Sequence, residues 1–170
     1  MKRLTIMRHA KSSWDDPKLD DFDRPLNPRG WKAARRVGDE LKRRKLKFDF
    51  GLASPAARVR ETIDGLIKGY GQPDFEIRFE PKIYEASLST LLDLVRALPE
   101  AANSSLIVGH NPGLERLVVD LAEDGERRDR LAEKFPTAAV ATLELPVQHW
   151  KDIQPGCGRI VELIVPKDLD

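Results

Sequence analysis

The chain has 170 residues, of which 41% are hydrophobic and 34% charged, a balance typical of a soluble globular protein with one buried core. Its 29 basic and 28 acidic residues leave a net charge of +1, which argues against a nucleic-acid or membrane-surface partner. Cys157 is the only cysteine, so no internal disulfide forms, and no apolar run reaches the ~20 residues of a membrane span. We expect a single cytoplasmic domain over residues 1–170.

The opening stretch Leu4–Met7 is apolar and predicts a short strand that runs directly into Arg8 and His9. Polar groups that follow a buried strand lie at its carboxyl end, where open α/β sheets bind ligands. A cation beside an imidazole suits a phosphate dianion, because Arg8 can bind oxygens and a neutral His9 can attack phosphorus. The alternative is a charged pair that merely ends a strand, and two residues alone do not decide between them.

The stretch Lys11–Asp23 has the composition of a loop and would lie over the end of the first strand. Within it, Trp14 either packs against the fold or contacts a substrate. A helix follows, because Asn27 is a good N-cap, Pro28 suits the first helical position, and apolar residues then recur at helical spacing as far as Leu41.

A second strand is predicted at Phe48–Ala53, and a helix follows Ser54 and Pro55. Arg58 falls in the first turn of that helix, where the helix dipole disfavours a cation. A bound anion nearby would explain an arginine at this position. The alternative is an ordinary surface arginine.

The rest of the chain continues to alternate strands and helices, and it ends in two consecutive strands. The further strands are expected at Phe75–Phe79, Ser105–Val108, Ala139–Leu145 and Arg159–Val165. A helix capped by Ser87 or Ser89 runs to Leu98, a helix opened by Pro112 runs to Leu121, and the charged stretch Glu123–Lys134 forms a solvated loop or a short helix. This order predicts an α/β three-layer sandwich with a mainly parallel central sheet and helices on both faces.

A second histidine occupies the same kind of position as the first. Gly109 and His110 follow the most strand-like run of the chain and precede a helix. Helix N-termini attract anions, so His110 is a second candidate for contact with phosphate. His149 lies in a turn-like stretch and is expected at the surface.

Taken together, Arg8-His9, Arg58 and Gly109-His110 resemble the histidine phosphatase superfamily, which has the phosphoglycerate-mutase-like fold. Ser54, Arg58 and Thr62 match its helix motif, and Leu26–Gly30 resembles the start of its first helix. The match spans residue 4 to about residue 118. The short chain is most similar to the SixA branch, the phosphohistidine phosphatases.

This resemblance implies a two-step reaction in which His9 becomes a phosphohistidine that water then hydrolyses. It places Arg8, Arg58 and His110 around the phosphoryl oxygens and requires no metal and no other cofactor. The chemistry of phosphoryl transfer is consistent with this, because it depends mainly on positioning and charge stabilisation. Nearby arginines would also depress the pKa of His9 and keep it neutral.

Two sequence features leave questions open. Ala10 stands where the family usually has glycine. Alanine fits this position only if its φ is negative. Glu85 lies in the region of the family's catalytic carboxylate and is the candidate general acid, with Asp15 and Asp16 as competitors. A role in capping the following helix is the alternative for Glu85.

We therefore expect a metal-independent phosphatase that acts on phosphohistidine or on another phosphorylated protein, since a short chain has little sequence to spare for a lid. The first alternative keeps this chemistry but takes a small phosphate ester as substrate. The second is a non-catalytic, phosphate-binding regulatory protein. The intact set of His9, Arg58 and His110 weighs against that second alternative.

Overall fold

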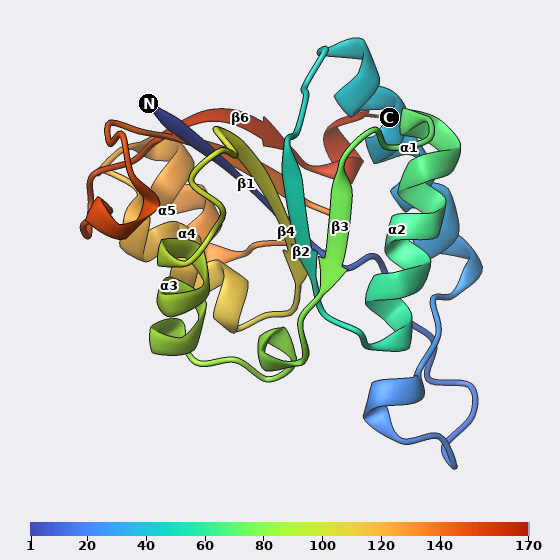
Figure 1. The fold of residues 1–170 in the computed structure, drawn as a ribbon. Coiled ribbons are helices and arrows are strands. Elements are labelled where there is room, and N and C mark those ends of the chain that lie inside the picture. The colour runs from blue at the N-terminus through green and yellow to red at the C-terminus, as the bar shows by residue number, and fades with distance from the viewer. Residues whose placement is uncertain (170) are drawn as a thin grey trace.

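A computed structural model describes residues 1–169 and shows a six-stranded sheet with helices on both faces, as the sequence predicts (Figure 1). The strands are β1 (Lys2–Arg8), β2 (Phe50–Ala53), β3 (Glu76–Phe79), β4 (Ser104–Gly109), β5 (Val140–Leu145) and β6 (Arg159–Ile164). The α-helices are α1 (Pro28–Arg43), α2 (Ala57–Tyr70), α3 (Leu88–Arg96), α4 (Gly113–Leu121) and α5 (Glu126–Glu133). Within the described residues, every helix is too short or too polar to cross a membrane.

Along the sheet the strands lie in the order β3-β2-β4-β1-β5-β6. The first four strands of the chain pair in parallel, whereas β5 runs antiparallel to both β1 and β6. Strand β1 is therefore central, and its last residue, Arg8, pairs with Gly109 at the end of β4. This register brings the next residue of each strand, His9 and His110, to the same point on the sheet edge.

Each face of the sheet is covered by its own set of helices (Figure 1). Leu4 and Ile6 of β1 pack with the apolar residues of α3, α4 and α5, whereas Met7 packs with those of α1 and α2. This alternation follows from the two-residue period of a strand. All three side chains are fully buried. Full burial of such a side chain contributes about 1.5–3 kcal/mol.

The chain leaves the two neighbouring strands β1 and β4 toward opposite faces of the sheet. After β1 it enters α1, which packs against α2 on one face, and after β4 it enters α4, which packs against α3 and α5 on the other. Adjacent parallel strands whose connections diverge in this way open a crevice at their carboxyl ends. The fold thus supplies a binding crevice where the two histidines lie.

Local signals set the helix ends as predicted. The Asn27 side chain accepts a hydrogen bond from the Gly30 backbone N–H at 2.8 Å, and the Ser87 side chain accepts one from Thr90 at 3.1 Å. Of the two alternatives for the charged stretch after α4, the short helix is confirmed. Leu131, fully buried, anchors this helix, α5, to the core.

Helices α1 and α2 approach each other through glycines. A Cβ atom placed on Gly38 would lie 2.2 Å from the backbone carbonyl oxygen of Leu66, and one on Gly69 would lie 2.1 Å from that of Arg35. Both distances are far below any real contact, so these positions admit only glycine without movement of backbone.

Candidate active site

His9 is the first residue beyond β1 and is only 6% exposed. Its backbone N–H donates to the Gly109 carbonyl at 2.9 Å, which fastens it to the end of β4. Its Nδ1 atom lies 2.6 Å from the Ala10 carbonyl oxygen. Because a carbonyl only accepts hydrogen bonds, Nδ1 carries the proton and Nε2 keeps its lone pair.

The surroundings of His9 keep the ring neutral. Burial lowers the pKa of His9 to about 4, and the hydrogen bond to Ala10 opposes this shift only in part. The positive charges of Arg58, Arg8 and Arg24 contribute to this lowering of the pKa. At neutral pH the imidazole is therefore uncharged, as a nucleophile requires.

His110 lies beside His9, with 5.4 Å between the two ring centroids. Its Nε2 atom is 2.7 Å from Ser54 Oγ, and Ser54 follows β2, the next strand along the sheet. Burial, followed by the charge of Arg58, lowers the pKa of His110 to about 3, so this ring is neutral as well. Its buried Nδ1 atom has no hydrogen-bond partner among the described residues.

The helix motif predicted from Ser54, Arg58 and Thr62 supports both histidines. Thr62 Oγ1 accepts a hydrogen bond from the Ala10 backbone N–H at 2.9 Å and donates one to the Arg58 carbonyl at 2.6 Å. Ala10 is fully buried and is not among the residues with positive φ, so alanine fits where the family usually has glycine. One helix therefore fixes the backbone directly after His9.

Arg8 and Arg58 meet at His9, although 50 positions separate them in sequence. Both line a cavity of about 560 Å³ that also contains His9, which we name the His9 cavity. Arg58 is 6% exposed, so it is not an ordinary surface arginine. Arg8 Nη1 donates to the Phe135 carbonyl at 3.2 Å, which orients its guanidinium.

The structure adds Arg24, which the sequence analysis did not identify. Arg24 lines the His9 cavity and is only 7% exposed. Its Nη2 atom donates a hydrogen bond to Ser12 Oγ at 2.7 Å. Its guanidinium carbon lies 3.4 Å from the ring centroid of Trp14, whose own side chain is 76% exposed. Trp14 thus packs on the site arginine and not in the core. An arginine in an otherwise acidic loop, just before a helix start, is the signal that could have revealed it.

Asp21 is a second site residue that the sequence did not predict, because it is one of several acidic residues in a loop. Arg58 Nη1 donates to the Asp21 backbone carbonyl at 2.7 Å, and Arg58 Nη2 donates to Asp21 Oδ2 at 3.0 Å. The Tyr84 hydroxyl donates to the same Oδ2 at 2.5 Å. Asp21 and Arg58 also line a second cavity of about 650 Å³ that contains His110, which we name the His110 cavity.

The three candidate general acids lie at different places. Glu85 lines the His110 cavity together with Arg58 and His110, so the structure brings it to the site. Its φ of 56° lies in the left-handed region, an arrangement that costs a residue with a side chain about 1–3 kcal/mol and often marks a functional site. Asp15 is exposed but lines the His9 cavity, whereas Asp16 is exposed and lines neither.

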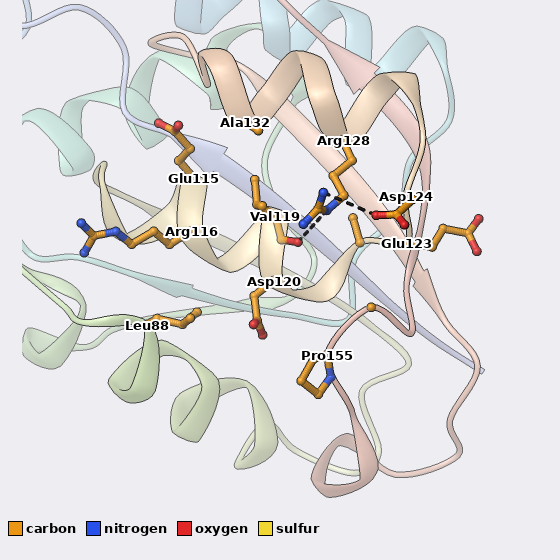
Figure 2. A pocket seen from close by; sticks show the side chains of 12 residues that line it. Leu88, Glu115, Arg116, Val119, Asp120, Glu123, Asp124, Arg128, Ala132 and Pro155 are labelled. Atoms are coloured by element: carbon orange, nitrogen blue, oxygen red, sulfur yellow. Dashed lines mark hydrogen bonds and ion pairs between the residues drawn. The ribbon is translucent and has the colours of Figure 1, made fainter.

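Other polar features lie away from this crevice. A groove of about 790 Å³ lies between α3, α4, α5 and the loop of Pro155. Asp120 points from α4 into the space between α3 and that loop (Figure 2). Arg128 lies in the wall of the groove and donates to the Val119 carbonyl at 3.0 Å. His149 is exposed, as expected, and lies 2.9 Å from Glu100. In the part of the chain that the structure describes, no group of three histidine, cysteine or acidic side chains could hold a metal ion.

Comparisons with known proteins relate the chain to one family. Residues 4–100 match the family model of the histidine phosphatase superfamily (branch 1). An uncharacterized protein of Mycobacterium tuberculosis is 34% identical over 165 residues, which cover 95% of this chain and 100% of that protein.

Two solved structures share the fold along nearly the whole chain. One is a protein from Agrobacterium tumefaciens assigned as the phosphohistidine phosphatase SixA, with a TM-score of 0.80 and 30% identity over 97% of this chain and 98% of that one. The other carries the same assignment in Nakamurella multipartitia, with a TM-score of 0.82 and 26% identity over 97% and 96%. The present chain therefore belongs to the histidine phosphatase superfamily.

Proposed function

We propose that this protein is a phosphatase that transfers a phosphoryl group to His9 and then to water, with phosphohistidine or another phosphorylated protein side chain as its substrate. One observation carries the proposal. His9, whose ring is neutral with an unprotonated Nε2 atom, lines one cavity together with the three arginines Arg8, Arg24 and Arg58. This pairs a nucleophile with the charges that a phosphate dianion needs.

In the first step the His9 Nε2–phosphorus bond forms as the bond from phosphorus to the leaving group breaks. The proton stays on Nδ1, which donates it in a hydrogen bond to the Ala10 carbonyl, so the phosphorylated ring is cationic. From this cationic ring the imidazole leaves readily, because it departs as a neutral group. In the second step water attacks phosphorus, the Nε2–phosphorus bond breaks, inorganic phosphate is released, and His9 returns to its neutral form. Neither step needs a metal ion.

The loop between β1 and α1, which contributes Trp14 to the His9 cavity, favours a protein as the substrate. Trp14, Leu19 and Phe22 lie on the loop between β1 and α1, with exposures of 76%, 40% and 37%. Large apolar side chains that a loop next to a site exposes to solvent can contact another protein. The SixA assignment of the two solved relatives points to phosphohistidine in particular.

A small phosphate ester is the second candidate, because the His110 cavity of about 650 Å³ is large enough for a compact leaving group. The two candidates are separated by comparing kcat/KM across phosphohistidine proteins and small phosphate esters, with EDTA present throughout. Higher kcat/KM for the small esters would replace the protein substrate. Loss of all activity in EDTA would contradict the metal-free mechanism.

Substitution of His9 by alanine tests the mechanism itself. We expect His9→Ala to abolish turnover of para-nitrophenyl phosphate while the thermal unfolding midpoint stays close to that of the wild type, because His9 lies at a strand end and not in either apolar cluster. Quenching the wild type during turnover without acid should trap phosphate on His9, as read by mass spectrometry. Phosphate on another residue, or activity retained by His9→Ala, would overturn the proposal.

A further inference from the structure

Asp21 stands on the boundary between the two cavities of the active site. It lines both the His9 cavity and the His110 cavity, as do Arg58 and Asn111. Its carboxylate is held by the Arg58 guanidinium at 3.0 Å and the Tyr84 hydroxyl at 2.5 Å, and it lies 3.5 Å from Arg24 Nε. A carboxylate bound by so many groups keeps a defined position, although its side chain is 52% exposed.

The carboxylate of Asp21 also stays charged. The hydrogen bond from Tyr84, followed by that from Arg58, holds the pKa of Asp21 below its ordinary value. An acid that is ionised at neutral pH has no proton to give to a leaving group. Asp21 therefore adds a fixed negative charge to the site and is not a candidate for the general acid.

This charge completes an electrostatic balance. Arg8, Arg24 and Arg58 line the His9 cavity together with Asp21, and the opposite charges of Lys11 and Asp15, which also line it, offset each other. A phosphate dianion would bring this group of charges to neutrality. A substrate with a further negative charge close to its phosphoryl group would bring an excess anion next to Asp21, whereas a cationic group there would be attracted.

Asp21 lies where the leaving group would pass from one cavity to the other. In-line displacement puts the leaving group on the side of phosphorus away from the attacking His9 Nε2. The His110 cavity is the adjoining space, and it shares Asp21, Arg58 and Asn111 with the His9 cavity. A leaving group that enters the His110 cavity passes the Asp21 carboxylate.

We infer that Asp21 determines substrate specificity by charge: it selects phosphoryl donors whose leaving group is neutral or cationic and rejects those that carry a carboxylate or a second phosphate beside the phosphoryl group. This inference rests on the proposed phosphatase function and narrows its substrate class. Such specificity works by repulsion: the unwanted leaving group carries a negative charge, as Asp21 does, whereas the wanted leaving group does not. A protein side chain such as phosphohistidine satisfies the rule, because its imidazole carries no negative charge.

The test uses a matched pair of aryl phosphates, 3-(aminomethyl)phenyl phosphate and 3-carboxyphenyl phosphate. We expect the wild type to prefer the cationic probe in kcat/KM, and Asp21→Asn to reduce that preference between about ten- and a hundredfold. Two unit charges about 6 Å apart at an effective dielectric constant of about 40 change each rate by about tenfold, in opposite directions for the two probes. Because each probe is compared with itself, the intrinsic reactivities of the two leaving groups cancel.

Two control variants separate charge from structure. Asp23→Asn removes a carboxylate from the same 3₁₀ turn, Asp21–Asp23, and should leave the preference unchanged, since no ion pair with Arg24 or Arg58 involves Asp23 among the described residues. Tyr84→Phe removes the hydrogen bond to Asp21 but keeps its charge, so the sign of the preference should persist. If Asp21→Asn lowers kcat/KM equally for both probes, Asp21 only holds Arg58 in place and the inference is wrong.

A binding measurement distinguishes failure of this inference from failure of the proposed function. The corresponding non-hydrolysable benzylphosphonates, one with a 3-aminomethyl group and one with a 3-carboxyl group, are titrated by calorimetry into the wild type and Asp21→Asn. Absence of turnover with both aryl phosphates in the wild type would contradict the phosphatase function. A ratio of phosphonate Kd values that is the same in both proteins would overturn charge selection by Asp21.

Discussion

At the scale of single residues, Glu85 raises the question of whether the site protonates its leaving group. An alkyl phosphate leaves as a strongly basic alkoxide, so a general acid is worth roughly 10²–10⁴-fold. Phosphohistidine and para-nitrophenyl phosphate leave readily without such help. We therefore expect Glu85→Gln to lower kcat for an alkyl phosphate severely and to spare the other two substrates by comparison. Equal losses of kcat on all three would assign Glu85 to shaping the His110 cavity.

The residues that the sequence predicted and those that it missed differ in one physical respect. His9 and His110 each follow a buried strand, so their meeting at one sheet edge follows from parallel pairing. Arg24 and Asp21 reach the site from the long loop between β1 and α1. Loop residues have no periodicity that fixes where they point, so only three-dimensional packing shows that this acidic run supplies both an arginine and a carboxylate to the site.

At the scale of elements, α2 contacts the backbone next to His9 through one hydroxyl group, that of Thr62. Thr62→Val keeps the side-chain shape but leaves the buried Ala10 N–H without an acceptor, which costs about 1–3 kcal/mol. We expect lower stability in urea unfolding and a lower kcat, because the Ala10 carbonyl orients His9. Thr62→Ser keeps the hydroxyl and should preserve kcat. A kcat for Thr62→Val equal to that of Thr62→Ser would show that this hydrogen bond does not position the ring.

The close contact of α1 with α2 makes a second element-scale prediction. An alanine at Gly38 would push its Cβ into the Leu66 carbonyl, so Gly38→Ala should destabilise the fold by about 1–3 kcal/mol or more. The control is Gly125→Ala, where an added Cβ meets nothing within 4 Å. Differential scanning calorimetry should show a clear decrease in Tm for the first variant only. Equal Tm values would mean that the helices can separate at little cost.

The sequence predicted the elements themselves better than it predicted these contacts. Capping at Asn27 and Ser87 and the apolar spacing of α1 are local signals, and the structure confirms them. The charged stretch after α4 was ambiguous, because a single buried apolar residue, Leu131, anchors α5. The glycine contact between α1 and α2 joins segments far apart in sequence, and no local pattern encodes it.

At the scale of the whole molecule, the two buried histidines make stability depend on pH. Their pKa values, about 4 for His9 and about 3 for His110, lie below the unfolded value of 6.5, so the unfolded chain binds protons first as the pH falls. This stability is fully present above pH 6.5 and is lost as the pH falls toward 4, by up to about 1.4 kcal/mol per pH unit for each histidine. Urea unfolding at pH 7.5, 5.5 and 4.5 should show this decline, and His110→Asn should reduce its slope. A wild-type stability that does not change over this range would refute it.

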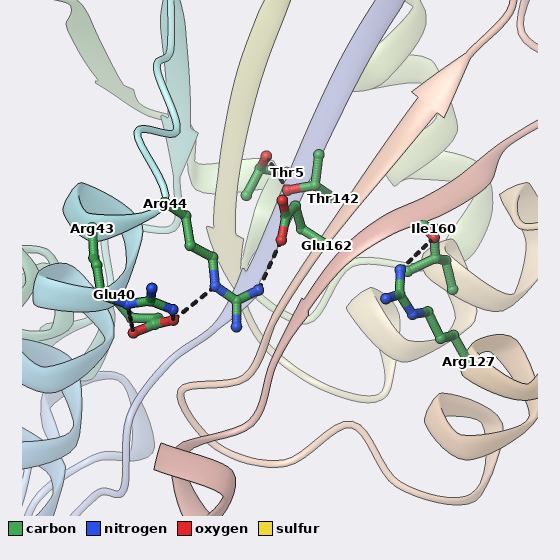
Figure 3. Close-up of polar contacts among 8 residues, drawn as sticks. All are labelled: Thr5, Glu40, Arg43, Arg44, Arg127, Thr142, Ile160 and Glu162. Carbon is green, nitrogen blue, oxygen red and sulfur yellow. Dashed lines mark hydrogen bonds and ion pairs between the residues drawn. The ribbon is translucent and has the colours of Figure 1, made fainter.

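An ion-pair network extends the pH dependence to more acidic conditions. Figure 3 shows Arg44, just after α1, between Glu40 of α1 and Glu162 of β6, with Nε 2.8 Å from Glu40 and Nη1 2.7 Å from Glu162. Hydrogen bonds from Arg43 and then Arg44 lower the pKa of Glu40 to about 2. The stability from Glu40 is thus present above its ordinary pKa of 4.5 and is lost only as the pH falls from there toward 2.

The central position of β1 has a consequence for biosynthesis. As the ribosome releases the chain, the apolar strand Leu4–Met7 emerges before both of its neighbours, because β4 begins at Ser104 and β5 at Val140. The strand therefore stays unpaired until β4 and β5 have been made, and pairing over such long sequence separations is slow. Enzymatic activity can return during refolding only when Arg8 and Gly109 have paired, so recovery of activity follows the slow long-range step and not the early formation of helices.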